Sequence, residues 1–289
     1  MRSKFKNALV LIMTASLLTS CATFIGKDIR RGSSSSLVDY LYPDGKVPPK
    51  HQQSIPHLQL PLTVGLAFVP SRNSYTSVLP EARKSQLLEN VKQKFAGLDY
   101  VKDIVVVPET YMRSSKGFDG VGQIARLYGL DIVALVSYDQ VSVTAEKKSS
   151  LLYWTIAGAY VIKGNQNKAT TFVDTAVFDV NSRKMLFRAP GVSEIKKSST
   201  LIEVRRTDRE IRDLGFEVAI KDMSNNLSVE LGRFKERIKV DKNVQVSYKQ
   251  GYSGSGSVQL SFLLIVVLMG MAIRRSSKKS KRVVAISKY

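Results

Sequence analysis

The stretch DIVALVSYDQVSVTA at residues 131–145 decides the fold, because it reads as one long strand that leads into a sheet. Two shorter apolar runs come before it, LTVGLAFVP at 62–70 and the strand around 103–107. Each shorter run is ended by a proline, and short apolar runs bounded by turn residues are typical of buried strands. These three stretches are therefore the predicted strands of the core.

Two predicted helices separate these strands. The first lies in the segment 77–98, where Gly97 marks the stop. Its apolar residues recur at helical spacing: Leu87, Leu88, Val91 and Phe95. The second is VGQIARLYGL at 121–130. Strands and helices that alternate at this spacing predict a parallel βαβαβ core with right-handed crossovers.

The pattern changes after this core. Strand-like runs at 151–164, 169–180 and 184–195 are separated by the turn signals NQNK and NSRK, which predicts an antiparallel meander with at least one half-buried face. A long polar helix follows at 203–239. It carries an apolar stripe: Ile211, Leu214, Val218, Leu227, Leu231, Phe234 and Ile238. The predicted fold class is α/β (α+β), with the meander and the long C-terminal helix extending the parallel core over residues 62–240.

Residues 21–61 are rich in serine and proline, a composition that cannot bury enough apolar surface to fold alone. We expect a flexible tether that holds the domain away from a bilayer. The two histidines of the chain, His51 and His57, both fall in this segment. Two histidines without further ligands do not define a metal site. The sequence therefore predicts neither a metal nor another cofactor.

The residues that could carry catalysis form no recognisable active site. GFDGVG at 117–122 lacks the Gly-Lys-Ser/Thr end of a phosphate-binding loop and is predicted to be a turn. A Ser/His/Asp triad would have no histidine within the predicted domain. Four acids alternate with lysines and arginines, which is typical of a solvated, salt-bridged surface: Glu194, Glu203, Asp208 and Glu210. We therefore predict a binding or assembly module and not an enzyme.

The net charge of +20 is concentrated at the ends of the chain. The first 21 residues hold Arg2, Lys4 and Lys6 without an acid, and residues 257–289 hold seven basic residues without an acid. Positive charge beside an apolar run is held on the cytoplasmic face of a membrane, so it reports topology. The remaining charge is scattered and lacks interleaved aromatic residues, so nucleic acid is not a predicted partner.

Residues 1–20 form a predicted lipoprotein signal peptide, with a basic start, a short apolar run and small residues before Cys21. Cys21 is the only cysteine, which excludes an internal disulfide. Four consecutive residues resemble the bacterial lipobox: Leu18, Thr19, Ser20 and Cys21. The resemblance implies that the mature chain begins at Cys21 and carries acyl chains there. Ala22 stands where inner-membrane lipoproteins carry Asp, which favours the outer membrane.

The end of the chain is predicted to be a second membrane signal. Residues 241–257 read as a Gly/Ser linker, 258–273 as a transmembrane helix and 274–289 as a basic cytoplasmic tail. The run 258–273 is apolar nearly all round, whereas a core helix shows a polar face. It is slightly short for a bilayer, but it spans one when Arg274 and Arg275 snorkel to the interface.

This collar, helix and tail resemble the C-terminal sorting signal that is processed by rhombosortase, a rhomboid-family intramembrane protease of Gram-negative bacteria. The matching positions are Gly254, Ser255, Gly256 and Ser257 for the motif, and Arg274 and Arg275 for the stop. Glycine and serine weaken a helix where such a protease must reach the peptide bond. Here Gly alternates with Ser instead of forming the paired glycines of the signal, so the resemblance does not fix the scissile bond.

A lipobox together with this tail is similar to the rhombotarget lipoprotein family. The element YGLDIVALVSY at 128–138 and the sheet after it are similar to the α/β domains of the curli secretion-pore lipoprotein and of the activators of penicillin-binding proteins. The family resemblance implies membrane lipid, lipoprotein-processing enzymes and a rhomboid-type protease as partners, with envelope proteins as further partners. It also implies an inner-membrane stage followed by lipid anchorage at the outer membrane or cell surface.

Two alternatives stay open at this point. One is a permanently two-anchored inner-membrane protein, in which the run 258–273 is a lasting transmembrane helix. The other is a subunit of an envelope secretion or cell-wall-synthesis assembly.

Overall fold

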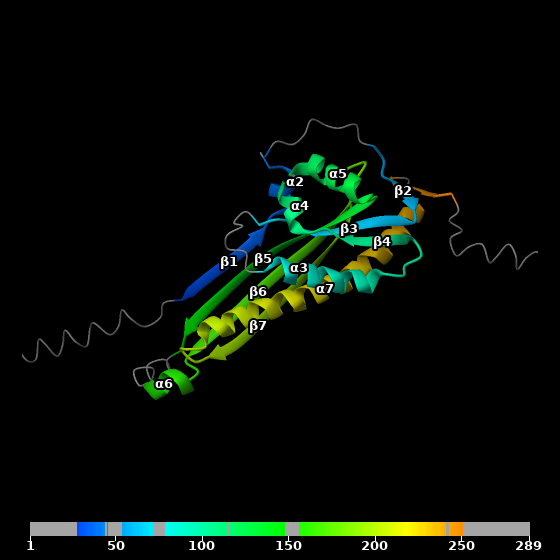
Figure 1. The fold of residues 1–289 in the computed structure, drawn as a ribbon. Helices are drawn as coiled ribbons and strands as arrows, with labels where there is room; N and C mark the ends of the chain where they lie inside the picture. The colour runs from blue at the N-terminus through cyan, green and yellow to red at the C-terminus, as the bar shows by residue number, and fades with distance from the viewer. Residues whose placement is uncertain are drawn as a thin grey trace, which may run out of the picture.

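Strand β5 (Ile132–Glu146) runs through the middle of a mixed sheet (Figure 1). The structure, a computed structural model, describes residues 28–43, 45, 54–71, 79–114, 116–147, 156–240 and 243–250. Among these residues, no helix is both long enough and apolar enough to cross a membrane. The predicted signals lie outside the described residues: the signal peptide with residues 18–21, the motif at 254–257, the apolar run at 258–273, and Arg274 and Arg275.

The parallel half of the sheet confirms the predicted core. β3 (Leu62–Phe68) pairs in parallel with β4 (Val101–Val106) on one side and with the first part of β5 on the other. α3 (Glu81–Phe95) connects β3 to β4, and α4 (Glu109–Ser114) and α5 (Gly117–Tyr128) connect β4 to β5. The turn predicted at 117–122 is wrong, because these residues form the first turns of α5 and bury Val121 against the sheet.

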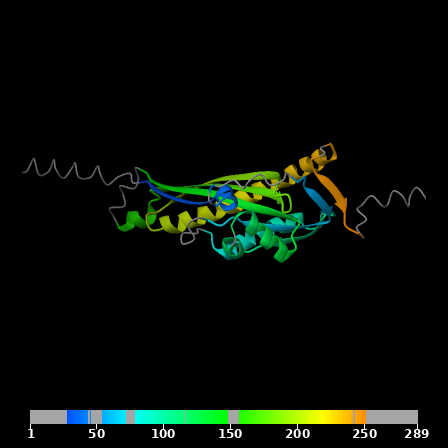
Figure 2. The ribbon, with the colours of Figure 1, turned by 90° about the horizontal axis from the view of Figure 1, so that it is seen from above.

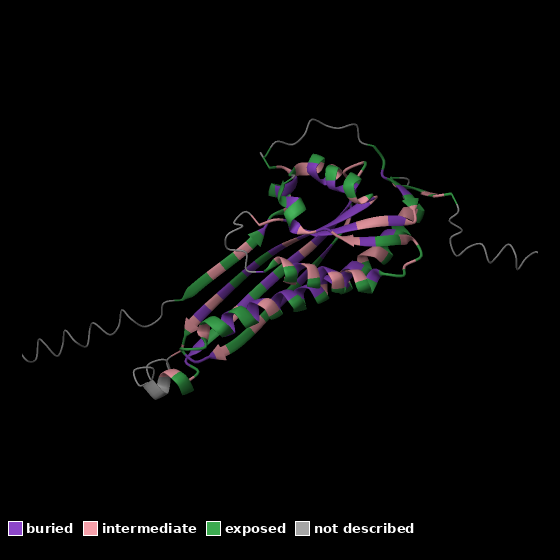
Figure 3. Cartoon of the chain, viewed as in Figure 1, coloured by how far each residue is buried: buried purple, intermediate pink, exposed green. Residues whose placement is uncertain are grey.

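The antiparallel half is a hairpin of two long strands. β6 (Asn165–Asp179) pairs with β5 along its whole length, and β7 (Met185–Ser199) pairs with β6. The predicted turn NSRK is confirmed, and Arg183 adopts a φ of 58° there. The predicted buried face is confirmed in β6, where every odd-numbered residue is buried, and Figure 3 shows buried stretches along this strand.

The strand predicted at 151–164 is wrong where the structure describes it, because Ile156–Val161 forms the short helix α6. The turn predicted at NQNK is wrong too, since β6 already begins at Asn165. Asn167 is fully buried, where its Oδ1 accepts a hydrogen bond from Thr144 Oγ1 and its Nδ2 donates one to Ser199 Oγ. These partners allow polar residues that resemble a turn to lie inside a sheet.

The predicted flexible tether over 21–61 is wrong for three segments. β1 (Ile29–Ser35) pairs antiparallel with β5, α2 (Leu37–Leu41) follows it, and β2 (His57–Leu60) pairs in parallel with β8 (Gln245–Tyr248). β3 pairs with β5 only as far as Val136, so the edge of β5 beyond it is open to another strand. β1 fills that edge from Tyr138 to Thr144 and satisfies its backbone groups.

The helix α7 (Val204–Val240) confirms the long predicted helix and covers one face of the sheet together with α3. α4 and α5 cover the opposite face, so the parallel half holds two separate apolar cores (Figure 1). The predicted stripe is confirmed at Ile211, Leu227 and Phe234, but Leu214 and Val218 are exposed. The molecule is elongated, with α6 at one end and the two-stranded β2–β8 sheet at the other (Figure 2).

Side chains of α7 also close the free edge of β7. Asp222 Oδ2 accepts a hydrogen bond from the backbone nitrogen of Val192 at 3.0 Å. Asn226 Nδ2 and an Arg237 guanidinium nitrogen donate to the backbone oxygens of Pro190 and Leu186, at 2.8 and 2.6 Å. An uncapped edge strand would pair with other chains, so these contacts both position α7 and protect the sheet.

Candidate functional site

The main apolar cavity lies where α3 ends and α7 continues. Arg83 near the start of α3 donates to Asp213 at 2.8 Å, and Lys94 near its end donates to Asn225 at 2.6 Å. The two helices therefore run side by side in the same direction. α3 ends at Phe95 before Gly97, which has a φ of +89°, whereas α7 extends to Val240. The last turns of α7 consequently have no part of α3 beside them.

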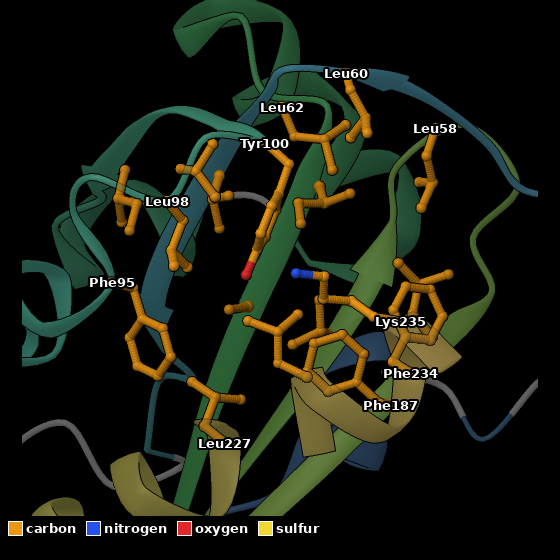
Figure 4. Close-up of a pocket in the computed structure, with 18 of the residues that line it drawn as sticks. Leu58, Leu60, Leu62, Phe95, Leu98, Tyr100, Phe187, Leu227, Phe234 and Lys235 are labelled. Atoms are coloured by element: carbon orange, nitrogen blue, oxygen red, sulfur yellow. The ribbon is translucent and has the colours of Figure 1, made fainter. Parts of the chain in front are cut away.

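This space is a pocket of about 390 Å³ with an almost wholly apolar lining (Figure 4). The sheet supplies its floor and includes Leu62, Val64 and Ile104. One wall is the face of α7 that carries Leu227, Leu231, Phe234 and Ile238, which follow one another at helical spacing. The β2–β8 sheet closes the end of the pocket with four residues: Leu58, Leu60, Val246 and Tyr248.

The charged groups of the lining all have the same sign. Lys92 comes from the last turn of α3, and Lys235 and Lys239 come from the last turns of α7. No carboxylate stands among the described residues that line the pocket. Lys239 pairs with Glu236 outside the lining at 2.7 Å. We call Lys92, Lys235 and Lys239 the lysine rim.

A contact between Tyr100 and Lys235 crosses this pocket. Lys235 Nζ lies 4.4 Å from the centroid of the Tyr100 ring, and Figure 4 shows the ammonium group beside the Tyr100 side chain within the pocket. Burial raises the pKa of Tyr100, and the adjacent Asp99 raises it further, so the phenol is neutral at neutral pH. Because the Lys235 side chain is exposed, the contact marks the side of the pocket that opens to solvent.

A second cluster of charges lies under the start of α3. Lys84 and Glu109 are both 2% exposed and form an ion pair, and Arg113 donates to Glu109 Oε1 at 2.9 Å. Burial lowers the pKa of Lys84 to about 8, so this lysine is still charged at neutral pH. Its Nζ lies 6.0 Å from the Phe68 ring and 5.9 Å from the Tyr138 ring. Neither Lys84 nor Glu109 lines the apolar pocket, so this buried pair belongs to the framework of the domain.

The acidic residues considered from the sequence divide into two groups. Glu194 pairs with Lys168 and Lys196, and Glu210 pairs with Lys197, on the surface as predicted. Asp208 differs from the prediction of a solvated residue. Its side chain is only 3% exposed and its Oδ2 lies 2.8 Å from Arg31 of β1. Over the described residues, no group of three or more His, Cys, Asp or Glu could hold a metal ion.

The sequence indicated only part of the pocket. The sequence predicts the apolar stripe of α7 from Leu227 to Ile238, but helical spacing does not show that a pocket lies beside it. The sequence places β2 in the predicted tether and β8 in the predicted linker, so it does not indicate the end of the pocket. The alternation of polar and apolar residues in HLQL at 57–60 and QVSY at 245–248 is the signal that could have found these strands. His57 lies in β2, where its Nε2 is 2.8 Å from Ser247 Oγ.

Comparisons with known proteins give only distant likenesses. No family model and no curated protein matches the chain. A neuraminyllactose-binding hemagglutinin homolog from Helicobacter pylori is 12% identical over 67% of this chain and 96% of its own, with a TM-score of 0.36. A PelC dodecamer from Paraburkholderia phytofirmans is 12% identical over 68% and 99%, with a TM-score of 0.26. The hypothetical protein CT253 from Chlamydia trachomatis is 10% identical over 60% and 96%, with a TM-score of 0.30.

Proposed function

We propose that this chain is an exported lipoprotein whose α/β domain is a non-enzymatic binding module for an apolar ligand at the cell envelope. The pocket beside the end of α7 carries this proposal, because it is a concave apolar space bounded by three separate elements. Pockets of about 300–1,000 Å³ with a few polar groups are the usual form of a small-molecule site, and this one has about 390 Å³. The lysine rim, Tyr100 and Tyr248 supply its polar groups.

The anchoring part of the proposal rests on the terminal signals. Cys21 takes the acyl chains, and a rhomboid-type protease removes the C-terminal helix near Gly254 to Ser257, as in the rhombotarget lipoproteins that the chain resembles. The protein is then at the inner membrane during processing and afterwards at the outer membrane or cell surface. Tyr248 lines the pocket, and residues 249–257 join it to the apolar run 258–273. The C-terminal helix would thus hold the β2–β8 end of the domain near the bilayer until it is removed.

Binding can be tested with an uncharged fluorescent probe that brightens in apolar surroundings. Leu231→Trp, on the α7 wall, is expected to fill the pocket and weaken probe affinity by about tenfold or more. Val229→Trp is the matched control, because Val229 lies on the exposed face of the same helix at 52% exposure. Val64→Phe, from the floor, repeats the test should Leu231→Trp unfold, as judged by circular dichroism. The proposal would be overturned if the wild type did not raise the fluorescence of the probe, or if the wild type and all three variants bound the probe with equal affinity.

Processing can be tested by measuring the mass of the mature protein from the native host. We expect a chain that starts at an acylated Cys21 and ends within residues 254–257. Cys21→Ser is expected to lose the acyl mass. The domain should still fold, because Cys21 is the only cysteine and its removal breaks no internal disulfide. A mature chain that still carries residues 258–273 would contradict the trimming. If that intact chain is found only in inner membrane, the protein is permanently two-anchored.

A further inference from the structure

We infer that the ligand of the pocket is a single acyl chain that ends in a carboxylate, with the chain in the apolar pocket and the carboxylate at the lysine rim. This inference deepens the proposed function and rests on it. It joins two independent observations, the apolar lining and the arrangement of the three cations around it. Neither observation alone defines the ligand.

The size of the pocket limits the ligand to one chain. A volume of about 390 Å³ is near the lower end of the about 300–1,000 Å³ that small-molecule sites occupy. The β2–β8 sheet closes one end, and α7 and the sheet floor close the sides, so the space is bounded in three directions. A two-chain lipid would have to leave most of one chain in water, which costs free energy for each exposed CH₂ group.

The sign of the charges selects an anionic head group. Lys92 comes from α3, whereas Lys235 and Lys239 are four residues apart and therefore lie on one face of α7. Three lysines from two helices line the same apolar space, and none of the described lining residues carries a carboxylate. Lys239 already pairs with Glu236 outside the lining at 2.7 Å, so the positive charge that an anionic ligand would meet comes mainly from Lys92 and Lys235. Hydrogen bonds between an ammonium group and a carboxylate are among the stronger ones in proteins. An uncharged head group would accept only a weaker hydrogen bond from this rim, and a cationic head group would be repelled by it.

A simpler explanation of the lysines is available and must be separated from this one. Lysines near helix C-termini also stabilise the helix dipole. Both explanations predict lysines in the last turns of α3 and α7. Only the ligand explanation predicts that removing them changes the binding of an anion without changing the binding of an uncharged analogue.

Ligand binding would begin at the Tyr100–Lys235 contact. The Lys235 ammonium lies over the Tyr100 ring at 4.4 Å and so forms a polar bridge across the open side of the pocket. Cation–π contacts at exposed sites are weak, so a carboxylate can replace the ring as the partner of Lys235. The neutral Tyr100 hydroxyl is then free to donate a second hydrogen bond to the same carboxylate.

The test compares three ligands of equal chain length: a saturated fatty acid, the primary alcohol and the primary amine. Each displaces the uncharged probe from the wild type, from Lys92→Gln/Lys235→Gln, and from the control Lys102→Gln/Lys221→Gln. The control removes the same amount of charge from exposed positions of β4 and α7, and neither residue lines the pocket. We expect the acid to bind the wild type about tenfold more tightly than the alcohol, and the rim variant alone to lose that advantage.

The outcomes separate this inference from the proposed function. Equal binding of acid, alcohol and amine to the wild type would overturn the carboxylate assignment while the apolar pocket stands. Rim and control variants with the same affinity for the acid would overturn the role of the lysine rim. A two-chain phospholipid that displaces the probe better than the acid would overturn the single chain. No displacement by any of them, with no probe binding, would overturn the proposed function itself.

Discussion

The Glu109→Gln variant is expected to lower the free energy of unfolding by about 3–5 kcal/mol, because it removes the carboxylate that is paired with the buried Lys84 and leaves Glu81 as the remaining nearby counter-charge. Both side chains are 2% exposed, and Glu109 also accepts hydrogen bonds from Arg113. Glutamine keeps the shape of the side chain and removes only its charge. Urea denaturation at about pH 7 measures the loss, with the linear extrapolation slope as a check on two-state behaviour.

The double variant Lys84→Met/Glu109→Gln is the matched control. Removing both charges of a buried pair is often neutral or stabilising, so this protein is expected to recover most of the stability that Glu109→Gln loses. A double variant as unstable as the single one would show that packing, and not the unpaired charge, causes the loss.

The effect of pH gives a second readout of the same pair. The pKa of Lys84 is lowered to about 8 in the folded protein, against 10.5 for an ordinary lysine. Between these values the unfolded chain binds more protons than the folded chain, so the contribution of this group to stability rises with pH. Losing the Glu109 carboxylate lowers the folded pKa further. The deficit of Glu109→Gln should therefore be smaller at about pH 9.5 than at pH 7, and a deficit that stays constant would contradict a charge effect.

The parallel core could be predicted from the sequence because its signals are local. The apolar runs of β3, β4 and β5, and the helical spacing in α3, each follow from a short window of residues. The same holds for the length of α7 and for the turn at 181–184. Each of these elements is stabilised mainly by burying an apolar face, which is the property that sequence periodicity reports.

The remaining elements depend on partners that are distant in the sequence. β1 contains mostly arginine, glycine and serine, and it is a strand because β5 has a free edge beside β3. Gln140 and Thr171 are fully buried in the sheet, where Gln140 Nε2 donates to Thr171 Oγ1 and to the backbone oxygen of Arg212 in α7. Polar residues that are satisfied in this way give no apolar pattern, so a sequence reading assigns them to the surface.

The candidate site shows the same limit. The apolar stripe from Leu227 to Ile238 could be predicted, but a stripe does not say whether the space beside it is filled. That depends on how α3 and α7 are aligned, since α3 stops beside the middle of α7. It depends also on the pairing of β2 with β8, two strands from opposite ends of the domain.

The Gly191→Ala variant is expected to lower the free energy of unfolding by about 3 kcal/mol, at the upper end of the usual cost of overpacking. A Cβ at this position of β7 would lie 2.2 Å from the backbone oxygen of Ala219 and 2.4 Å from the backbone nitrogen of Met223. Both obstacles belong to the backbone of α7, so no side-chain rotation relieves them. Because Gly191 has no side chain, α7 lies directly against the backbone of β7 at this position.

Gly32→Ala is the matched control for this prediction. Gly32 also lies in a strand of the same sheet, but its Cβ would come no closer than 3.9 Å to another residue outside its neighbours. We expect this variant to keep the stability of the wild type or to gain slightly, since alanine restricts the unfolded chain. Equal melting temperatures for the two variants would contradict the close approach of α7 to β7.

The position of Gly191 also connects this packing to the pocket. Met223, which its Cβ would strike, is one turn before Leu227 at the start of the pocket wall. Asp222 and Asn226 fix the same part of α7 to the backbone of Val192 and Pro190. Pushing α7 away from β7 would therefore strain these hydrogen bonds and displace the wall that carries Leu231 and Phe234.

Gly191→Ala should weaken probe binding under conditions where the protein is still folded, whereas Gly32→Ala should leave it unchanged. A destabilised Gly191→Ala protein that binds the probe normally would show that the pocket wall is held independently of this contact.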